Sequence, residues 1–319
     1  MSATGLAPDR ALAGLPLVVL PVADAQERAD RHRDHATRYT EPHRARRSAG
    51  VKHPVADFLF TYYALSAGKL ERWHPGAGAV LTGAAAEERA GWKDYRPLDA
   101  AERDALGLAT DDAAVTADVG GFLARRSATV AFVRRLLGAT ASRPGQFGCF
   151  GLHEWAMVYR QGADERRHEA LPLRLSAEQT DAVVESHRIR CSHIDAFRFF
   201  TAEATGRNEL QPTRQTQPDL EQPGCLHATM DLYKWAFTLL PLVPSELVLT
   251  ALDLAAAVRE VDMRASPYDL AGHGLTPIRI ETPTGKAEYV AAQRGFAERG
   301  ADLRRRLLAE LERVDPRAR

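Results

Sequence analysis

The sequence predicts a mainly α-helical protein that folds as a single globular domain with a few short strands and one long polar loop. Apolar residues recur at helical spacing in several long segments, most clearly over Val119–Leu137, where they form one continuous face. Of the 319 residues, 45% are hydrophobic and 26% are charged, as is typical of globular rather than disordered, fibrous or membrane proteins. Because no internal repeat or linker divides the chain, one domain is the simplest expectation.

The order of the expected elements follows from local signals. Residues 1–23 are expected to form a partly extended segment, and residues 24–319 to form the helical domain. The stretch from Trp73 to Ala90 is rich in alanine and glycine, which indicates a turn followed by a surface connection, and Trp92–Pro97 is expected to be extended or irregular. The predicted helices are Asp24–Arg47, Val55–Tyr63, Ala100–Leu106, Val119–Leu137 with a stop at Gly138, a helix from Ser176 toward His187, Leu226–Leu239, Ser245–Met263 capped by Ser245, and Lys286–Val314.

The long polar loop is expected between Thr205 and Gly224. This segment holds several prolines and many side-chain amides, which disfavour regular structure. Long loops in compact domains are often functional.

Charge and cysteine content limit the class of protein. The chain has 42 Lys+Arg and 42 Asp+Glu, so no global field draws it to nucleic acid or to an anionic membrane. A nucleic-acid contact would need a local patch, of which Arg44, Arg46 and Arg47 form the strongest. Three cysteines in a long chain argue against a disulfide framework and predict a cytoplasmic protein. No apolar run approaches the ~20 residues that a membrane span needs.

Several common enzyme motifs are missing from the sequence. It has no Gly-x-Gly-x-x-Gly, no Walker-type Gly-Lys-Ser/Thr and no Gly-x-Ser-x-Gly elbow, so dinucleotide binding, P-loop and α/β-hydrolase chemistry are not indicated. The His-x-Glu and Pro-Cys-x-x-Cys signature of zinc nucleobase deaminases is also missing.

Histidine, cysteine and carboxylate residues gather in three separate strings between residues 147 and 235. The strings are Cys149-Phe-Gly-Leu-His153-Glu154, His187-Arg-Ile-Arg-Cys191-Ser-His193-Ile-Asp195 and Cys225-Leu-His227-Ala-Thr-Met-Asp231. His227 and Asp231 stand at i and i+4 of a predicted helix, so both project from one face.

Two or three imidazoles with one carboxylate would suit non-haem iron, manganese or zinc. The candidate metal ligands are His153, His187, His193, Asp195 and His227, with Asp231 as a further one. Alternatively, the histidines form hydrogen bonds in a polar core and the cysteines act as small hydrophobic residues.

Aromatic, amide and arginine side chains accompany the same strings. The candidates for substrate binding are Trp155, Tyr159, Arg198, Arg214, Gln217, Tyr233 and Trp235. A pocket for an extruded base needs stacking faces, amides that read the base edge and a carboxylate that activates water, and all three types occur here. Alternatively, the aromatic residues pack in the core and the arginines form ion pairs. Asp262 and Arg264 are expected to belong to a structural ion-pair corner.

Five strings together resemble an actinobacterial family whose members commonly carry the label 3-methyladenine DNA glycosylase. They are His53-Pro54-Val-Ala-Asp57-Phe-Leu-Phe-Thr-Tyr62-Tyr63, Arg72-Trp73-His74-Pro75-Gly76, Gly148-Cys-Phe-Gly-Leu-His153-Glu154-Trp155-Ala-Met-Val-Tyr159-Arg160, Arg190-Cys-Ser-His193-Ile-Asp195-Ala-Phe-Arg198 and Gln222-Pro-Gly-Cys-Leu-His227. The resemblance extends from His32 to Ala297 and implies excision of alkylated purines from DNA. It assigns no catalytic residue.

These observations leave three hypotheses. The first is a DNA-repair glycosylase without a cofactor, in which Asp195, Asp231 or Glu154 is the catalytic carboxylate and DNA is the partner. The second is an oxygenase or hydrolase that uses iron, manganese or zinc at the histidine and aspartate residues and acts on a small substrate. The third is a helical binding module, which would be favoured if the histidines lay far apart and the polar loop were disordered.

Overall fold

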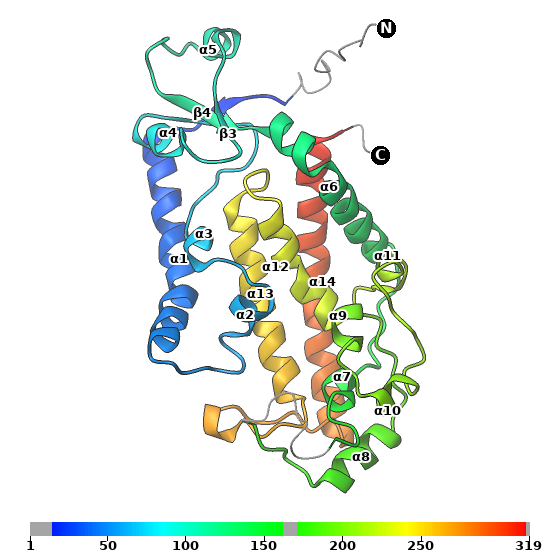
Figure 1. Cartoon of the computed structure of the whole chain (residues 1–319). Coiled ribbons are helices and arrows are strands. Elements are labelled where there is room, and N and C mark those ends of the chain that lie inside the picture. Colours follow the sequence, from blue (N-terminus) through cyan, green and yellow to red (C-terminus); the bar gives the residue numbers. More distant parts are fainter. Residues whose placement is uncertain (1–14, 162–170, 317–319) are drawn as a thin grey trace, which may run out of the picture.

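The protein is a helical bundle with a small sheet at one end. The structure, a computed structural model, describes residues 15–161 and 171–316 (Figure 1). It is about 57% helical and 6% strand, so the prediction of a mainly α-helical domain with a few short strands is confirmed. None of the helices in the described ranges combines the length and apolar character that a membrane crossing requires. Of the N-terminal segment 1–23, residues 1–14 lie outside the described residues.

Three long helices form the centre of the bundle. Helices α12 (Leu226–Thr238), α13 (Ser245–Arg264) and α14 (Pro283–Val314) all contact one another (Figure 1). α12 is buried on nearly all sides, as expected for a helix that is apolar around its circumference. Two further long helices flank the centre. α6 (Val119–Ala141) packs on α14, and α1 (Val22–Ser48) packs on α13.

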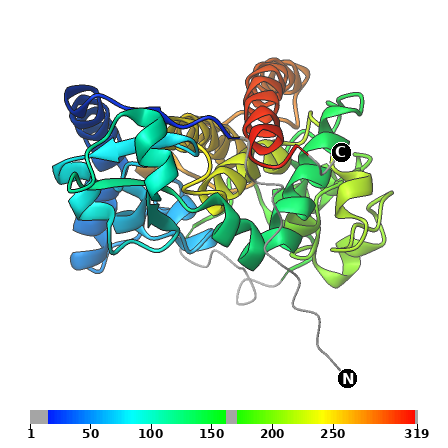
Figure 2. The same cartoon turned by 90° about the horizontal axis from the view of Figure 1, so that it is seen from above.

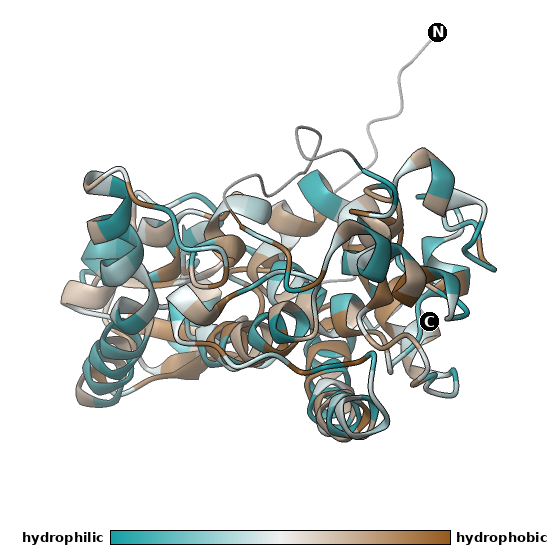
Figure 3. Cartoon of the chain, turned by 90° about the horizontal axis from the view of Figure 1, so that it is seen from below, coloured by the Kyte–Doolittle hydropathy of each residue, from teal (hydrophilic) through white to brown (hydrophobic). Residues whose placement is uncertain are grey.

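The outer helix α1 is polar, as its sequence predicts. It buries only Ala25, His32, Ala36 and Thr40, and Figure 3 shows it at the lower left as mainly hydrophilic. α6 continues three residues beyond Gly138, so the stop predicted there is wrong. The cap predicted at Ser245 is also wrong, because its hydroxyl oxygen accepts a hydrogen bond from the backbone N–H of His74, 2.9 Å away, instead of from its own helix.

The small sheet lies at the end of the molecule where helices α4 (Ala84–Arg89) and α5 (Ala100–Leu106) are found (Figure 1). Its strands are β1 (Val18–Val19), β2 (Ala79–Thr82), β3 (Tyr95–Pro97) and β4 (Ala114–Ala117), in the order β1-β2-β4-β3. β1 pairs with β2 in parallel, and the other two pairs are antiparallel.

The surface connection predicted through Ala90 is therefore wrong. This stretch contains β2 and helix α4 (Ala84–Arg89), and it buries Val80 and Leu81 completely. The buried strand is so short that its alanine- and glycine-rich surroundings hide the strand pattern.

Short helices and connections cover the side of the bundle away from α1 (Figures 1 and 2). They are α7 (Leu152–Ala156), α8 (Ala177–Glu185), α9 (Ile194–Phe197), α10 (Ala202–Thr205) and α11 (Gln217–Leu220). The remaining short helices are α2 (Phe58–Tyr62), α3 (Ala67–Leu70), α5 (Ala100–Leu106) and the 3-10 helix η3 (Ala271–His273).

The predicted polar loop, 205–224, joins α10 to α12 and contains α11. Its Asn208 side chain accepts a hydrogen bond from the backbone N–H of Cys191 at 2.7 Å and donates one to the carbonyl of the same residue at 2.9 Å.

Candidate functional site

Three histidines from distant parts of the chain meet inside the bundle. His153 lies on α7, His193 precedes the first residue of α9, and His227 lies on α12. The ring centroids of His153 and His227 are 4.5 Å apart, and those of His193 and His227 are 5.4 Å apart. All three side chains are buried, with exposed fractions of 2%, 1% and 6% respectively.

The first group of side chains, here called the His153 cluster, consists of His153, His227 and Asp262. Their possible ligand atoms lie within 4.8 Å of one another. His153 Nε2 lies 2.9 Å from Asp262 Oδ1, yet neither atom has a hydrogen-bond partner among the described residues, so the two are close without being aligned for a hydrogen bond.

Asp262 is the residue of this cluster that sequence reasoning missed. The prediction of a structural ion pair is correct in part, because Asp262 forms one with Arg259, whose Nη1 lies 3.2 Å from Asp262 Oδ2. Arg264 pairs elsewhere, with its Nη2 3.2 Å from Glu288 Oε1. The other oxygen, however, faces His153. The available signal was a carboxylate on the otherwise apolar face of α13, one helical turn after Val258.

The second group, the His193 cluster, consists of His193, Glu221 and Asp231. His193 Nε2 lies 3.0 Å from Glu221 Oε1 and 3.6 Å from Asp231 Oδ2. Tyr63 donates its hydroxyl to the other Asp231 oxygen at 2.5 Å, and Gln217 donates an amide N–H to Glu221 Oε1 at 2.5 Å. Sequence reasoning missed Glu221, which lies in the predicted polar loop.

The carboxylates of the two clusters set the pKa values of the three histidines. Burial alone would lower the pKa of His153, but the Asp262 carboxylate outweighs burial and raises it well above its ordinary value. In the same way, Glu221 and Asp231 outweigh burial and raise the pKa of His193 to about 10. His227 has no such excess of anions, so burial and the neighbouring His153 lower its pKa well below the ordinary value. Near neutral pH the site therefore contains two imidazolium ions and one neutral imidazole.

Two predicted site residues take other partners. Asp195 is buried but belongs to neither cluster. It forms an ion pair with both guanidinium nitrogens of Arg214, one of them at 3.0 Å, and lies 3.2 Å from Arg198 Nε. His187 lies at the end of α8, where its Nδ1 is 2.6 Å from the carbonyl oxygen of Val183. The structure thus brings His153, His193, His227 and Asp231 together and leaves these two aside.

Glu154 lies beside the His153 cluster. Its Oε1 accepts a hydrogen bond at 2.9 Å from Arg259 Nη1, the atom that also faces Asp262. The Nε and Nη2 atoms of Arg259 have no hydrogen-bond partner among the described residues, although the side chain is only 1% exposed.

The aromatic residues predicted to stack on a base lie in the hydrophobic core. Trp155 and Tyr233 are fully buried, and Trp155 donates its indole N–H to the carbonyl oxygen of Ala265 at 2.9 Å. Tyr159 is 1% exposed, with its hydroxyl 2.8 Å from Glu185 Oε1. Trp235 is 9% exposed and contacts the Phe132 and Lys234 side chains.

The predicted basic patch is largely neutralised. Arg44 forms a two-pronged ion pair with Glu71, with contacts of 2.6 and 2.9 Å. Arg46 binds Asp57 through its Nη2 atom at 2.7 Å. Arg47 is exposed.

A small pocket opens beside His227. Its volume is about 40 Å³, which is enough for one or two water molecules. Its lining residues are Phe58, Tyr62, Glu154, Met157, Asp195, Phe199, His227 and Arg259. Phe58, Tyr62 and Phe199 are half-buried and form its outer part, whereas His227 and Arg259 are buried.

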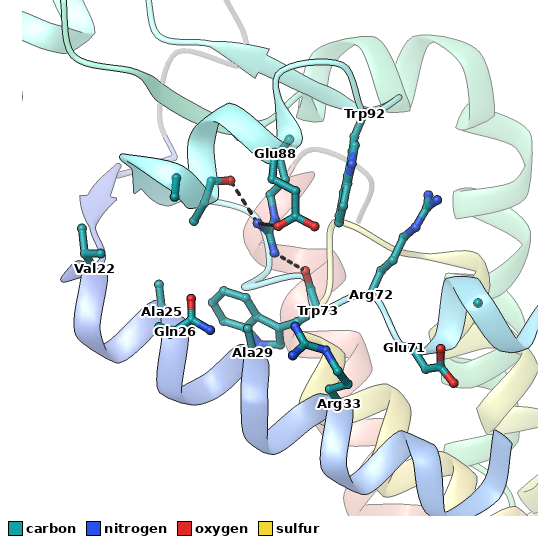
Figure 4. Close-up of a pocket in the computed structure, with 14 residues that line it drawn as sticks. Val22, Ala25, Gln26, Ala29, Arg33, Glu71, Arg72, Trp73, Glu88 and Trp92 are labelled. Carbon is teal, nitrogen blue, oxygen red and sulfur yellow. Dashed lines mark hydrogen bonds and ion pairs between the residues drawn. The ribbon is translucent and has the colours of Figure 1, made fainter. Parts of the chain in front are cut away.

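A larger cavity of about 300 Å³ lies between α1 and α4 (Figure 4). Its walls include Trp73, Trp92 and the guanidinium groups of Arg33 and Arg72 (Figure 4). Both tryptophans are already stacked with arginines, because Arg89 lies 5.7 Å from the Trp73 ring and 4.8 Å from the Trp92 ring. None of the site residues predicted from the sequence lines this cavity.

No family model, curated protein or solved structure matches the chain. The resemblance to proteins labelled 3-methyladenine DNA glycosylase therefore stays a prediction from the sequence.

Proposed function

We propose that the chain is a metal-dependent enzyme whose ion is held by the His153 cluster and which acts on a small substrate. The observation that carries the proposal is the meeting of His153, His227 and Asp262, buried and from three different helices, with their possible ligand atoms within 4.8 Å. Two imidazoles and one carboxylate leave coordination positions open for substrate, as in non-haem Fe(II) oxygenases. The same donors suit Mn²⁺, and Zn²⁺ in hydrolases. We place the oxygenase first because this donor set is the one such oxygenases use.

The pocket beside His227 has room for one or two water molecules, so a substrate would enter it with one small group only. The pocket reaches the His153 cluster at His227. Arg259 lines its wall, and the Nε and Nη2 atoms of this side chain have no hydrogen-bond partner within residues 15–161 and 171–316. An anionic group on the substrate, such as a carboxylate, would pair with this guanidinium.

The His193 cluster would support the centre without taking part in binding the first ion. Asp231 and His227 share α12, one helical turn apart, so the position of one constrains that of the other. A protonated His193 next to Glu221 and Asp231 would serve as a proton reservoir near the substrate pocket.

Metal content tests the proposal. Tag-free protein should contain about one equivalent of iron, manganese or zinc. His227→Ala and Asp262→Asn should each hold about one equivalent less metal than the wild type, because either change leaves two donors. His187→Ala is the matched control, because its imidazole lies outside both clusters, and it should keep the metal. A wild-type protein without metal, or one whose metal survives all three changes, would overturn the proposal.

The glycosylase implied by the resemblance is the second candidate, with DNA as its partner. It needs an aromatic face open to an extruded base, whereas Trp155, Tyr159 and Tyr233 are packed in the core. Base release from methylated duplex DNA by the pure protein, and its loss in Asp195→Asn, would favour this function over the metal-dependent one.

A non-enzymatic binding module has less support, because its two conditions are not met. The histidines meet, and the polar loop packs on the site through Asn208, Gln217 and Glu221. For the compartment we propose the cytoplasm, because all three cysteines are free.

A further inference from the structure

The three cysteines of the chain line one small cavity. Cys149 precedes α7, Cys191 precedes α9, and Cys225 stands directly before α12, so three separate segments deliver them. The cavity has a volume of about 20 Å³, somewhat more than the 10–15 Å³ or so that one water molecule needs. The thiols are free, and no disulfide joins them.

The polar groups around this cavity are incompletely satisfied. Gln293, 1% exposed, donates its amide N–H to the carbonyl oxygen of Gly224 at 2.6 Å, while its own Oε1 has no partner among the described residues. His153 turns Nδ1 toward Cys149, whose Sγ lies 4.0 Å away, and turns Nε2 toward Asp262. His153 and His227 both line the thiol cavity, so the cavity directly adjoins the His153 cluster.

The inner thiols are protonated while the cavity is empty. Burial raises the pKa of Cys225 to about 12, and burial together with the nearby Cys149 raises that of Cys191 well above its ordinary value. Any cation that binds here must therefore displace their protons, and its affinity should rise with pH.

We infer that this cavity binds one soft metal cation, Zn²⁺ or Cu⁺, through the thiolates of Cys149, Cys191 and Cys225. Thiolates select these two ions over harder cations. The three sulfur atoms do not all lie within 4.8 Å of one another, and Cys191 Sγ donates to the carbonyl oxygen of His193 at 3.6 Å. The thiols would therefore have to turn inward by rotation about χ1 to reach Zn–S distances of about 2.3 Å. The cavity is too small for an iron–sulfur cluster. Binding releases the thiol protons to solvent and moves no electrons.

An ion has a route to the cavity. Cys149, Arg190 and Gln222 line both the cavity and an open groove of about 230 Å³, so an ion that enters here passes the Arg190 side chain. Cys149 is half-buried, whereas Cys191 is 3% exposed. Of these two thiols, Cys149 should therefore be the one that reagents reach first.

Cobalt substitution tests the proposal on the full, tag-free chain. Co²⁺ bound to thiolates gives a strong charge-transfer band in the near ultraviolet, which Co²⁺ bound only to imidazole and carboxylate does not give. The band should appear in the wild type and in Asp262→Asn, and be lost in Cys191→Ser and Cys225→Ser. Asp262→Asn separates the two proposals, because it removes a ligand of the His153 cluster and leaves the thiols in place.

Thiol labelling of the wild type gives a readout that does not depend on how a variant folds. Loading with Zn²⁺, or with Cu⁺ under reducing conditions, should slow alkylation of Cys149 by at least about tenfold, and protection by either ion supports the site. Equal alkylation rates with and without both ions, together with no charge-transfer band, would overturn it. A wild-type protein that binds metal at the thiols but not at the His153 cluster would overturn the proposed function and would still support the thiol site.

Discussion

Replacement of Arg259 by methionine should be strongly destabilising. The guanidinium is 1% exposed, with Nη1 2.9 Å from Glu154 Oε1 and 3.2 Å from Asp262 Oδ2, and it lies over the Phe58 ring at 3.8 Å. Methionine fills similar space but leaves both carboxylates buried without their cation. Removing one partner of a buried ion pair costs about 3–5 kcal/mol, and a desolvated cation–π contact contributes about 2 kcal/mol of the gross interaction.

The free energy of unfolding should therefore fall by about 3–5 kcal/mol in Arg259→Met, a large part of the 5–15 kcal/mol or so that is typical of a folded domain. Urea unfolding in the presence of a chelator, followed by tryptophan fluorescence, measures it without any contribution from bound metal. The control is Arg305→Met, since Arg305 pairs with Asp302 at 2.9 Å on the surface with side chains 69% and 54% exposed. That change should cost less than about 1 kcal/mol. An equally small loss in Arg259→Met would refute the account of a dry, mutually dependent charge network.

Three further outcomes are expected. The fold raises the pKa of His193 from 6.5 to about 10, so the protonated imidazole stabilises the metal-free fold fully below pH 6.5. The free energy of unfolding should therefore decline as the pH rises from 6.5 to 10. In His193→Gln this decline should be smaller. Tyr63→Phe should lower the unfolding free energy by about 1–3 kcal/mol, because it leaves an oxygen of Asp231 buried without its donor, and an unchanged urea midpoint would contradict this. Gly224→Ala should lower the melting temperature, because its Cβ would lie 2.4 Å from a backbone carbonyl oxygen, whereas Gly206→Ala, which meets nothing within 4 Å, should leave it unchanged or higher.

Much of the helical framework could be predicted, because long amphipathic segments carry their own signal. The sequence gives the bounds of α5, Ala100–Leu106, as the structure has them. β2 could not be predicted in the same way, because a four-residue strand in an alanine-rich stretch has too few positions to show alternation. The stop at Gly138 failed because a glycine with nothing near its Cβ position is tolerated inside a long helix.

The candidate site could be predicted only in part. His153, His193 and His227 share a local composition that indicates a common centre, and the structure brings them together. The apolar face of α13 marks Asp262 as an unusual carboxylate, but its partner His153 lies 109 residues earlier in the chain, so the local sequence does not show which residue it meets. Spacing also misled for Asp195, which stands two residues from His193 but projects toward Arg214 because α9 begins between them.

The His227 and Asp231 pair shows that helical spacing predicts a shared helix face but not shared partners. The two residues do lie one turn apart on α12, as predicted. Yet His227 joins His153 and Asp262, whereas Asp231 joins His193 and Glu221. A shared helix face fixes direction, and the neighbouring elements decide which partners each side chain meets.

Anomalous diffraction from crystals of the tag-free protein, recorded at the absorption edge of the metal that it contains, tests the central claim most directly. The account predicts a peak at bonding distance, about 2.0–2.2 Å, from a nitrogen of His153, a nitrogen of His227 and an oxygen of Asp262. The absence of such a peak, with His153 Nε2 hydrogen-bonded directly to Asp262, would contradict it.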